Sequence, residues 1–323
     1  MEILIEKYAP VLIPTLCRFE HFRNCLESLR RCTHAGQTEV FIALDYPAKP
    51  EHEEGYRRIC NYLDGLIGEH GFGTLNIIRR DRNYGLGMNG NLAEAQDKIL
   101  QMYDRIILSE DDNVFSPNFL DYMNKGLKLF ENDQSVLSIN GYRYDCPIRF
   151  DGNNYFRQHV GISGWGYGAW RDRKETCLRK INHRYFVKIL FNPSALWRIR
   201  KNGYDKLLSY AGFLLEWDGL VIDSTLNIYM AVEKIDVIMP ALSLVRNCGW
   251  DGSGENCQTT NNTLREQFCS SCIDDAYYFD YQGDPYRFYK ENCNLIAKNG
   301  YSRIGFGSFI VRLGKLFIRK LLK

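Results

Sequence analysis

Apolar residues in the first third of the chain alternate between short runs and longer amphipathic stretches. Short apolar runs predict strands, and apolar positions that recur three or four residues apart predict helices. Alternation of the two is typical of βαβ units, which build a mostly parallel sheet with helices on both faces. The sequence therefore predicts a doubly wound, Rossmann-like α/β fold. The expected strands are 10–15, 39–45, 75–80 and 105–109, and the expected helices are 19–32, 52–70 and 87–102.

The pattern continues beyond the fourth strand. Ser116 and Pro117 resemble a helix N-cap and a first-turn proline, which predicts a helix that ends near Phe130. A further strand is expected at residues 136–140. The second half is interpreted as the same domain with long loops, so that residues 8–258 form one domain and residues 259–323 form a C-terminal extension.

Composition narrows the class of protein. The chain of 323 residues is 45% hydrophobic and 25% charged, with a net charge of +2. These values are ordinary for a soluble globular protein and give no global attraction to nucleic acid. The N-terminus lacks the pattern of a secretory signal, and no apolar run is long enough to span a membrane. We therefore expect a cytoplasmic protein.

The 11 cysteines are scattered through the chain. Free thiols are the favoured interpretation, because no paired disulfide framework is evident. A structural zinc site is the alternative, since Cys269 and Cys272 form a CxxC pair and Cys248 and Cys257 lie near it in sequence.

Polar side chains follow each predicted strand. In doubly wound sheets, ligands bind in the crevice beyond the carboxyl ends of the strands. Four such clusters are therefore expected to share one edge of the sheet and to form a common site. They are Thr15 with Arg18, Asp45, Arg82 with Asn83, and the acidic run Glu110, Asp111 and Asp112.

The acidic run is the strongest local signal. Three adjacent carboxylates repel one another, and a hard divalent cation such as Mg²⁺ or Mn²⁺ would remove that repulsion. The alternative is a solvated acidic turn that caps the next helix.

Residues 106–142, IILSEDDNVFSPNFLDYMNKGLKLFENDQSVLSINGY, resemble the metal-binding segment of GT-A-fold glycosyltransferases. The resemblance is closest to the N-acetylglucosaminyltransferase I family, in which an E-D-D triplet ends a strand, and it extends to bacterial family-2-type sugar transferases. It implies that Asp112 binds Mn²⁺ or Mg²⁺ and that Glu110 and Asp111 contact a nucleotide-sugar donor.

Other segments resemble the same family more loosely. The start, PVLIPTLCRFEHFRNCLESL, implies that Thr15 and Arg18 lie near the base and phosphates of the donor. Asp45 matches the position that meets the base edge. The run RDRNYGLGMNGN resembles a segment that lines the nucleoside pocket, which implies donor contacts for Arg82 and Asn83.

Two later segments extend the resemblance. GISGWGYGAW resembles part of the sugar pocket, where Trp165 would offer an aromatic face. LLEWDGLVIDSTLNIYM resembles the segment with the catalytic base, which places that role on Asp218. Because Gly219 replaces a second aspartate of the family, Glu216 remains a rival. The Gly-rich segment PALSLVRNCGWDGSGENC is either a lid over the donor or a surface loop.

The C-terminal run SFIVRLGKLFIRKLLK predicts a basic amphipathic helix. Such a helix is typical of a segment that lies on an anionic membrane surface, here the inner face of the cell membrane. The alternative is a helix packed on the protein body with its cations in solvent.

The resemblance implies a metal-dependent, inverting glycosyltransferase that moves a sugar, expected from a UDP-sugar, to a saccharide or lipid-linked acceptor in surface polysaccharide or glycan biosynthesis. Two alternatives stay open: a sugar nucleotidyltransferase and a non-catalytic nucleotide-sugar-binding protein at the membrane. The first would normally carry a Gly-rich loop and a lysine directly after the first strand, and PTLCRFEHF has neither.

Overall fold

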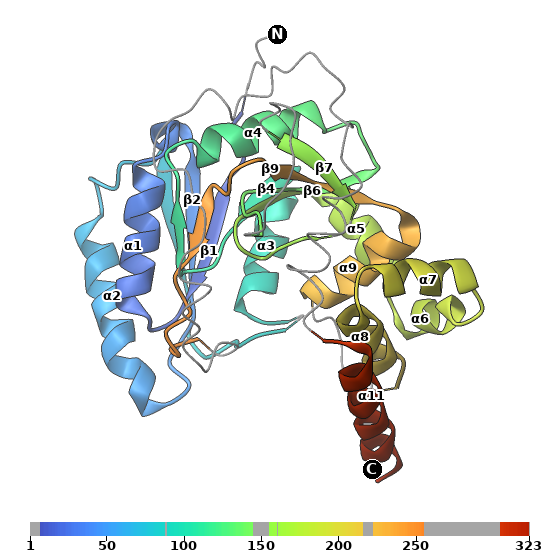
Figure 1. The fold of residues 1–323 in the computed structure, drawn as a ribbon. Helices are drawn as coiled ribbons and strands as arrows, with labels where there is room; N and C mark the ends of the chain where they lie inside the picture. Colours follow the sequence, from blue (N-terminus) through green and yellow to red (C-terminus); the bar gives the residue numbers. More distant parts are fainter. Residues whose placement is uncertain are drawn as a thin grey trace.

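A mixed eight-stranded sheet forms the centre of the protein (Figure 1). The computed structural model describes residues 7–87, 89–144, 155–159, 161–215, 222–254 and 304–322. Within them the strand order is β3-β2-β1-β4-β8-β6-β9-β7. The strands are β1 (Val11–Thr15), β2 (Glu39–Leu44), β3 (Thr74–Arg79), β4 (Arg105–Leu108), β6 (Val136–Asn140), β7 (Tyr155–His159), β8 (Tyr167–Trp170) and β9 (Asp236–Pro240).

Helices connect these strands. They are α1 (Phe19–Arg30), α2 (Glu53–Gly65), α3 (Asn91–Met102), α4 (Phe119–Leu129), α5 (Arg171–Lys180), α6 (His183–Ile189), α7 (Pro193–Lys201), α8 (Tyr204–Leu215), α9 (Ile222–Glu233) and α11 (Phe306–Leu321). Short 3₁₀ turns lie at Ala35–Gln37 and Pro50–His52. All strands and helices expected in residues 10–140 are present, with ends that shift by a few residues, and the predicted C-terminal helix is α11.

The predicted α/β class is confirmed. Strands β3, β2, β1 and β4 are parallel neighbours, and β6 and β9 are also parallel. The sequence did not predict β8, which runs antiparallel between β4 and β6, or β7, which runs antiparallel along β9. These two short strands make a mostly parallel sheet into a mixed one.

Both faces of the sheet are apolar, because successive residues of a strand point to opposite sides. In β2, Val40 and Ile42 belong to one buried cluster, and Phe41 and Ala43 belong to another. The first cluster lies under α1, α2 and α4. On the opposite face, α3 covers the β1–β2–β4 part of the sheet and the helices α5–α9 cover the β6–β9 part (Figure 1). The result is a three-layer α/β/α architecture.

The start of α4 differs from the prediction. The helix begins at Phe119 and its N-cap is Asn118, so Ser116 and Pro117 precede the helix. The reason is a second, two-stranded sheet in which β5 (Asn113–Phe115) pairs antiparallel with β10 (Val245–Asn247). The strand pair holds residues 113–116 in extended conformation and delays the helix.

Five cysteines of the described residues bear on the thiol prediction. Cys25, Cys32, Cys60, Cys177 and Cys248 are free thiols, as expected. The CxxC pair and Cys257 lie outside the described residues. Within the described part of the chain, no helix is both long and apolar enough to cross a membrane.

Candidate functional site

The carboxyl ends of the first four strands share one edge, as parallel pairing requires. The amide of Asp45 donates to the Thr15 carbonyl (2.9 Å), and the amide of Ser109 donates to the Leu12 carbonyl (3.1 Å). The polar residues that follow these strands therefore lie along one edge of the sheet.

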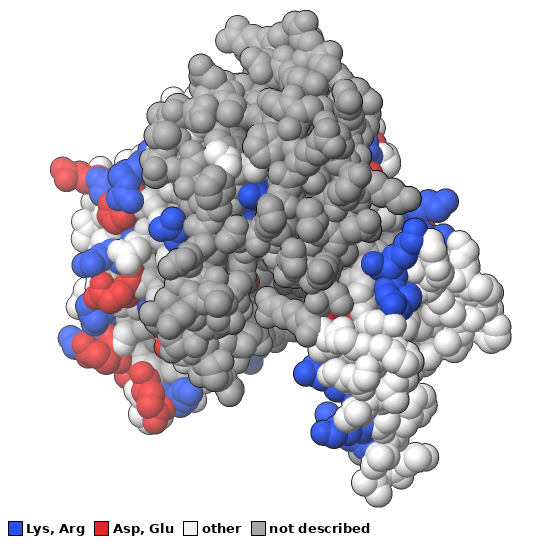
Figure 2. Space-filling view, in the orientation of Figure 1, with Lys and Arg blue, Asp and Glu red and all other residues white. Residues whose placement is uncertain are grey.

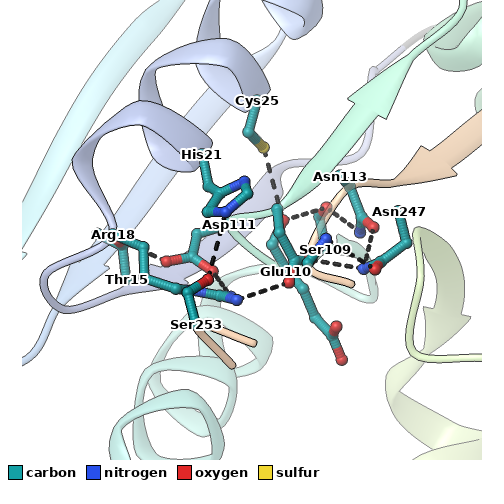
Figure 3. Close-up of polar contacts among 12 residues, drawn as sticks. Thr15, Arg18, His21, Cys25, Ser109, Glu110, Asp111, Asn113, Asn247 and Ser253 are labelled. Atoms are coloured by element: carbon teal, nitrogen blue, oxygen red, sulfur yellow. Dashed lines mark hydrogen bonds and ion pairs between the residues drawn. The ribbon is translucent and has the colours of Figure 1, made fainter. Parts of the chain in front are cut away.

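Asp111 lies within reach of the loop after β1. Its carboxylate accepts a hydrogen bond of 3.0 Å from the Thr15 hydroxyl and forms an ion pair with the Arg18 guanidinium (Figure 3). The Asp111 side chain is buried, with the whole residue 7% exposed. Three of the residues expected to contact a donor are thus brought together by the pairing of β1 with β4.

Asp112 is held from two directions. Its Oδ2 atom is 2.9 Å from the Nη1 atom of Arg18, and its Oδ1 atom accepts a hydrogen bond of 2.6 Å from the Asn247 side chain. Its carbonyl accepts from the amide of Cys248 (2.8 Å). Gly249 packs so closely that a Cβ atom there would lie 2.0 Å from Asp112 Oδ2. The absence of a side chain at Gly249 therefore makes room for the Asp112 carboxylate.

One guanidinium faces two carboxylates at the centre of the site. Burial lowers the pKa of Arg18, but the nearby Asp111 and Asp112 outweigh this effect and raise it. Burial raises the pKa of Asp111, the Arg18 charge opposes that rise, and the Asp112 charge adds to it. Arg18 therefore stays charged and offsets only part of the negative charge.

The third carboxylate of the run lies apart from this pair. Figure 3 shows the side chain of Glu110 pointing away from Asp111. The carbonyl of Glu110 accepts from the Ser109 hydroxyl (3.0 Å), and that hydroxyl accepts from the Asn113 amide group (2.9 Å). Among the described residues, no group of three or more His, Cys, Asp or Glu side chains could hold a metal ion. Arg18 relieves part of the repulsion between Asp111 and Asp112 that the acidic run predicts.

Asp45 organises the loop that follows β3. Its carboxylate accepts from the amides of Tyr46 (2.9 Å), Tyr84 (2.8 Å) and Gly85 (2.9 Å), and from the Asn83 side chain (3.4 Å). Asp45 is buried. It connects the end of β2 to the Gly-rich loop, a role that the resemblance did not indicate.

Arg82 and Trp165 lie in aromatic surroundings. The guanidinium of Arg82 is 5.3 Å from the centroid of the Tyr84 ring.

The Trp165 ring packs edge-on against Tyr142, with centroids 4.6 Å apart, and against Trp250, with centroids 6.0 Å apart. Two tryptophans thus lie together beside the acidic run, because Trp250 follows the loop residues that contact Asp112.

The sequence singled out the Gly-rich segment as a lid or a surface loop, but it did not predict that residues 247–253 contact Asp112 and His21. Besides Asn247, Gly249 and Trp250, this loop carries Asp251, whose carboxylate is 2.8 Å from the Nε2 atom of His21 on α1. Burial raises the pKa of Asp251, but hydrogen bonds from Ser253 and the neighbouring His21 outweigh burial and lower it. The short apolar run ALSLV, which leads into β10, is the signal in the sequence for a strand here. It does not indicate the pairing of that strand, because the partner β5 lies more than a hundred residues earlier.

The two candidates for the catalytic base, Asp218 and Glu216, lie outside the described residues. The preceding helix α8 ends at Leu215, and α9 begins at Ile222. The roles of both residues stay predictions.

The two comparisons by sequence found no match, and the comparison with solved structures found several similar chains. No protein-family model matches the chain, and no curated protein matches it by sequence. Among solved structures, the mannosyltransferase PcManGT from Pyrobaculum calidifontis, in complex with GDP-Man and Mn²⁺, is similar at 13% identity and a TM-score of 0.36. That match covers 70% of this chain and 69% of PcManGT.

Structures of S. aureus TarS are also similar. The match to TarS 1-349 has 10% identity and a TM-score of 0.39, and covers 73% of this chain and 58% of TarS 1-349. The complex of TarS 1-349 with UDP-GlcNAc matches at 11% identity and a TM-score of 0.30, covering 46% of this chain and 38% of the other. This chain therefore spans less than two thirds of the TarS structures it resembles.

Proposed function

We propose that this chain is a glycosyltransferase that takes a sugar from a nucleotide-sugar donor, with a UDP-sugar as the first candidate. The observation that carries the proposal is the convergence of Thr15, Arg18, Asp111 and Asp112 at the carboxyl edge of the sheet. Doubly wound folds bind nucleotides at this edge, and an arginine guanidinium is a suitable partner for a phosphate. The E-D-D motif supports the same class of reaction.

A divalent cation is part of the proposal but does not fit the side chains as they lie. Both oxygens of Asp112 are already engaged, by Arg18 and by Asn247. Carboxylate oxygens are suitable ligands for Mg²⁺ or Mn²⁺. A cation on Asp112 would compete with the guanidinium, so the proposed reaction contains no step that depends on it.

The transfer itself needs a base and a place for the sugar. The acceptor hydroxyl attacks the anomeric carbon, the bond from that carbon to the diphosphate oxygen breaks, and a carboxylate takes the hydroxyl proton. Asp218 is the proposed base, with Glu216 as the rival. Trp165 and Trp250 offer aromatic surface beside Asp112 for a pyranose ring. The proposed acceptor is a saccharide or a lipid-linked saccharide.

Donor binding is the first test. Purified protein is screened by thermal shift against a panel of nucleotide sugars, with and without Mn²⁺. A donor at a hundred times its Kd should add about 2.7 kcal/mol to the free energy of unfolding. Asp112→Asn should lose the part of this shift that requires Mn²⁺. Asp133→Asn is the matched control, because Asp133 precedes β6 at the opposite edge of the sheet.

Turnover is measured with the donor that binds. Asp218→Asn should keep the thermal shift and lose transfer by roughly 10²- to 10⁴-fold, whereas Glu216→Gln should keep both. The reverse result would move the base to Glu216. Failure of every nucleotide sugar to bind, or formation of a nucleotide sugar from a sugar phosphate and a nucleoside triphosphate, contradicts the proposal.

A further inference from the structure

Helix α11 has apolar side chains on two sides, and only one of these sides packs against the rest of the described structure. Among the described elements, its main contact is with α8, where Phe309 is 7% exposed and its ring centroid lies 5.3 Å from that of Tyr204. Leu313 and Leu316 are half-buried and follow Phe309 on the same side of the helix, at spacings of four and three residues. One stripe of α11 therefore accounts for its attachment.

A second apolar face of α11 is open to solvent. Exposed fractions are 48% for Ile310, 59% for Val311, 48% for Phe317, 59% for Ile318 and 84% for Leu321. At about 3.6 residues per turn, these positions form an arc beside the stripe that packs on α8. Soluble proteins rarely leave such a contiguous apolar face uncovered unless it binds something.

A basic stripe borders this apolar arc. Arg312, Lys315 and Arg319 are exposed and recur at spacings of three and four residues, which places them on one side of the helix. The sequence of α11 contains no Asp or Glu. A helix with a wide apolar face and an exclusively basic polar face matches an interface between water and an anionic bilayer.

The neighbouring helix α7 extends the positive charge. Arg200 and Lys201 are exposed in its last turn, and the Arg200 guanidinium lies 3.6 Å from the ring centroid of Tyr204, which also contacts Phe306. In the view of Figure 2, acidic and basic side chains are interspersed over α1 and α2, whereas the charged side chains on the lobe that contains α7 and α11 are mainly basic. The charge distribution therefore favours an anionic partner on this side.

We infer that the exposed face of α11 is a docking surface for an anionic lipid bilayer. Ile310, Phe317, Ile318 and Leu321 enter the boundary between headgroups and acyl chains, and Arg312, Lys315 and Arg319 contact the lipid phosphates. Phe309 keeps the helix on α8, so the protein body is held at the surface through α11. The inference does not depend on the transfer reaction.

Vesicle co-sedimentation of the full chain tests this surface. Binding is compared between phosphatidylcholine vesicles and vesicles that also contain phosphatidylglycerol, at low and at high salt. We expect binding to the anionic vesicles only, with a clear loss at high salt. The variant Arg312→Gln/Lys315→Gln/Arg319→Gln should weaken the partition on the order of 100-fold, since each basic residue near an anionic surface contributes about a fivefold factor.

A matched control removes the same charge elsewhere. Arg23→Gln/Arg57→Gln/Lys98→Gln changes three exposed cations on α1, α2 and α3 and should bind vesicles as the wild type does. Ile318→Asp tests the apolar face and should also abolish binding, with circular dichroism confirming the fold. Equal binding to neutral and anionic vesicles, no binding at all, or a dimer in solution that Ile318→Asp dissociates would each overturn the inference.

Discussion

Arg18 decides the electrostatics of the candidate site. The three carboxylates of the acidic run were expected to need a cation, and the E-D-D motif pointed to a metal. In the structure, the guanidinium lies on Asp111 and Asp112, while the Glu110 side chain points elsewhere. The sequence shows that three carboxylates are adjacent, but it does not show which cation pairs with them. Arg18 is remote from the acidic run in sequence and lies beside it only because β1 pairs with β4.

Substitution of Arg18 should change both the stability of the protein and its affinity for Mn²⁺. Arg18→Gln leaves two buried carboxylates without that positive partner, which we expect to lower the free energy of unfolding by about 3–5 kcal/mol. Because Mn²⁺ can replace the lost charge, the variant should bind Mn²⁺ more tightly than the wild type and regain part of its stability. Urea denaturation with and without Mn²⁺, together with Mn²⁺ titration followed by electron paramagnetic resonance, measures both effects. Weaker Mn²⁺ binding in the variant would contradict this account.

Gly249 provides a steric test at the same site. In Gly249→Ala, the new methyl group would overlap Asp112 Oδ2, and that carboxylate is fixed by Arg18 and Asn247. We expect a loss of about 1–3 kcal/mol in the free energy of unfolding.

The control for this substitution is Gly212→Ala. Gly212 lies within α8, and a methyl group added there would meet no heavy atom within 4 Å, its own helix backbone aside. Alanine should therefore be neutral or stabilising by up to about 1 kcal/mol. Urea denaturation curves of the two variants measure the difference in the free energy of unfolding. Similar midpoints would show that the loop around Gly249 accommodates the methyl group, which would contradict the prediction.

At the scale of elements, short strands whose pairing the sequence did not predict complete the site. β10 pairs with β5, with Asn113 opposite Asn247, and this pairing brings the 247–253 loop to Asp112. β8 pairs with both β4 and β6, so that Trp165, just before β8, lies at the carboxyl edge. Strands of three or four residues carry too short an apolar pattern to be recognised, and their pairing depends on partners remote in sequence.

The β6, β7 and β9 part of the sheet should respond to acid. Arg157 on β7 bonds to Asp236 on β9 (2.6 Å) and to Asp133 before β6 (3.0 Å). Burial raises the pKa of Asp133, but hydrogen bonds from Ser135 and the charge of Arg157 lower it below its ordinary 3.8. The ionised carboxylate therefore stabilises the fold at any pH above about 3.8, and this contribution is lost as pH falls through the lowered pKa.

Asp133→Asn measures that contribution. At pH 6 the variant should be less stable than the wild type by at most about 1 kcal/mol, since the pair is partly exposed. The difference should stay constant down to about pH 4 and shrink below it, as followed by urea midpoints at a series of pH values. A difference that grows on acidification would refute the assigned direction of the pKa change.

At the scale of the whole molecule, the proposed chemistry and the proposed lipid contact lie on different elements. The acidic run lies at the carboxyl edge of β4, whereas α11 extends from α8 on the helix layer over the β6–β9 part (Figure 1). The two surfaces belong to different parts of the fold. Their functions can therefore be tested independently, with donor binding reporting on one and vesicle binding on the other.

The sequence by itself determined the α/β class, the order of elements through β6 apart from the short β5, the helix α11 and the edge at which polar side chains gather. Local periodicity specifies strands and helices, and parallel pairing forces their carboxyl ends to one side. Only the tertiary structure decided that Arg18 lies between Asp111 and Asp112, that Asn247 and Gly249 hold Asp112, and that part of α11 stays exposed. Those contacts join residues that are remote in sequence. The periodicity of apolar residues specifies each helix and strand, but it does not specify which side chains from different elements come into contact.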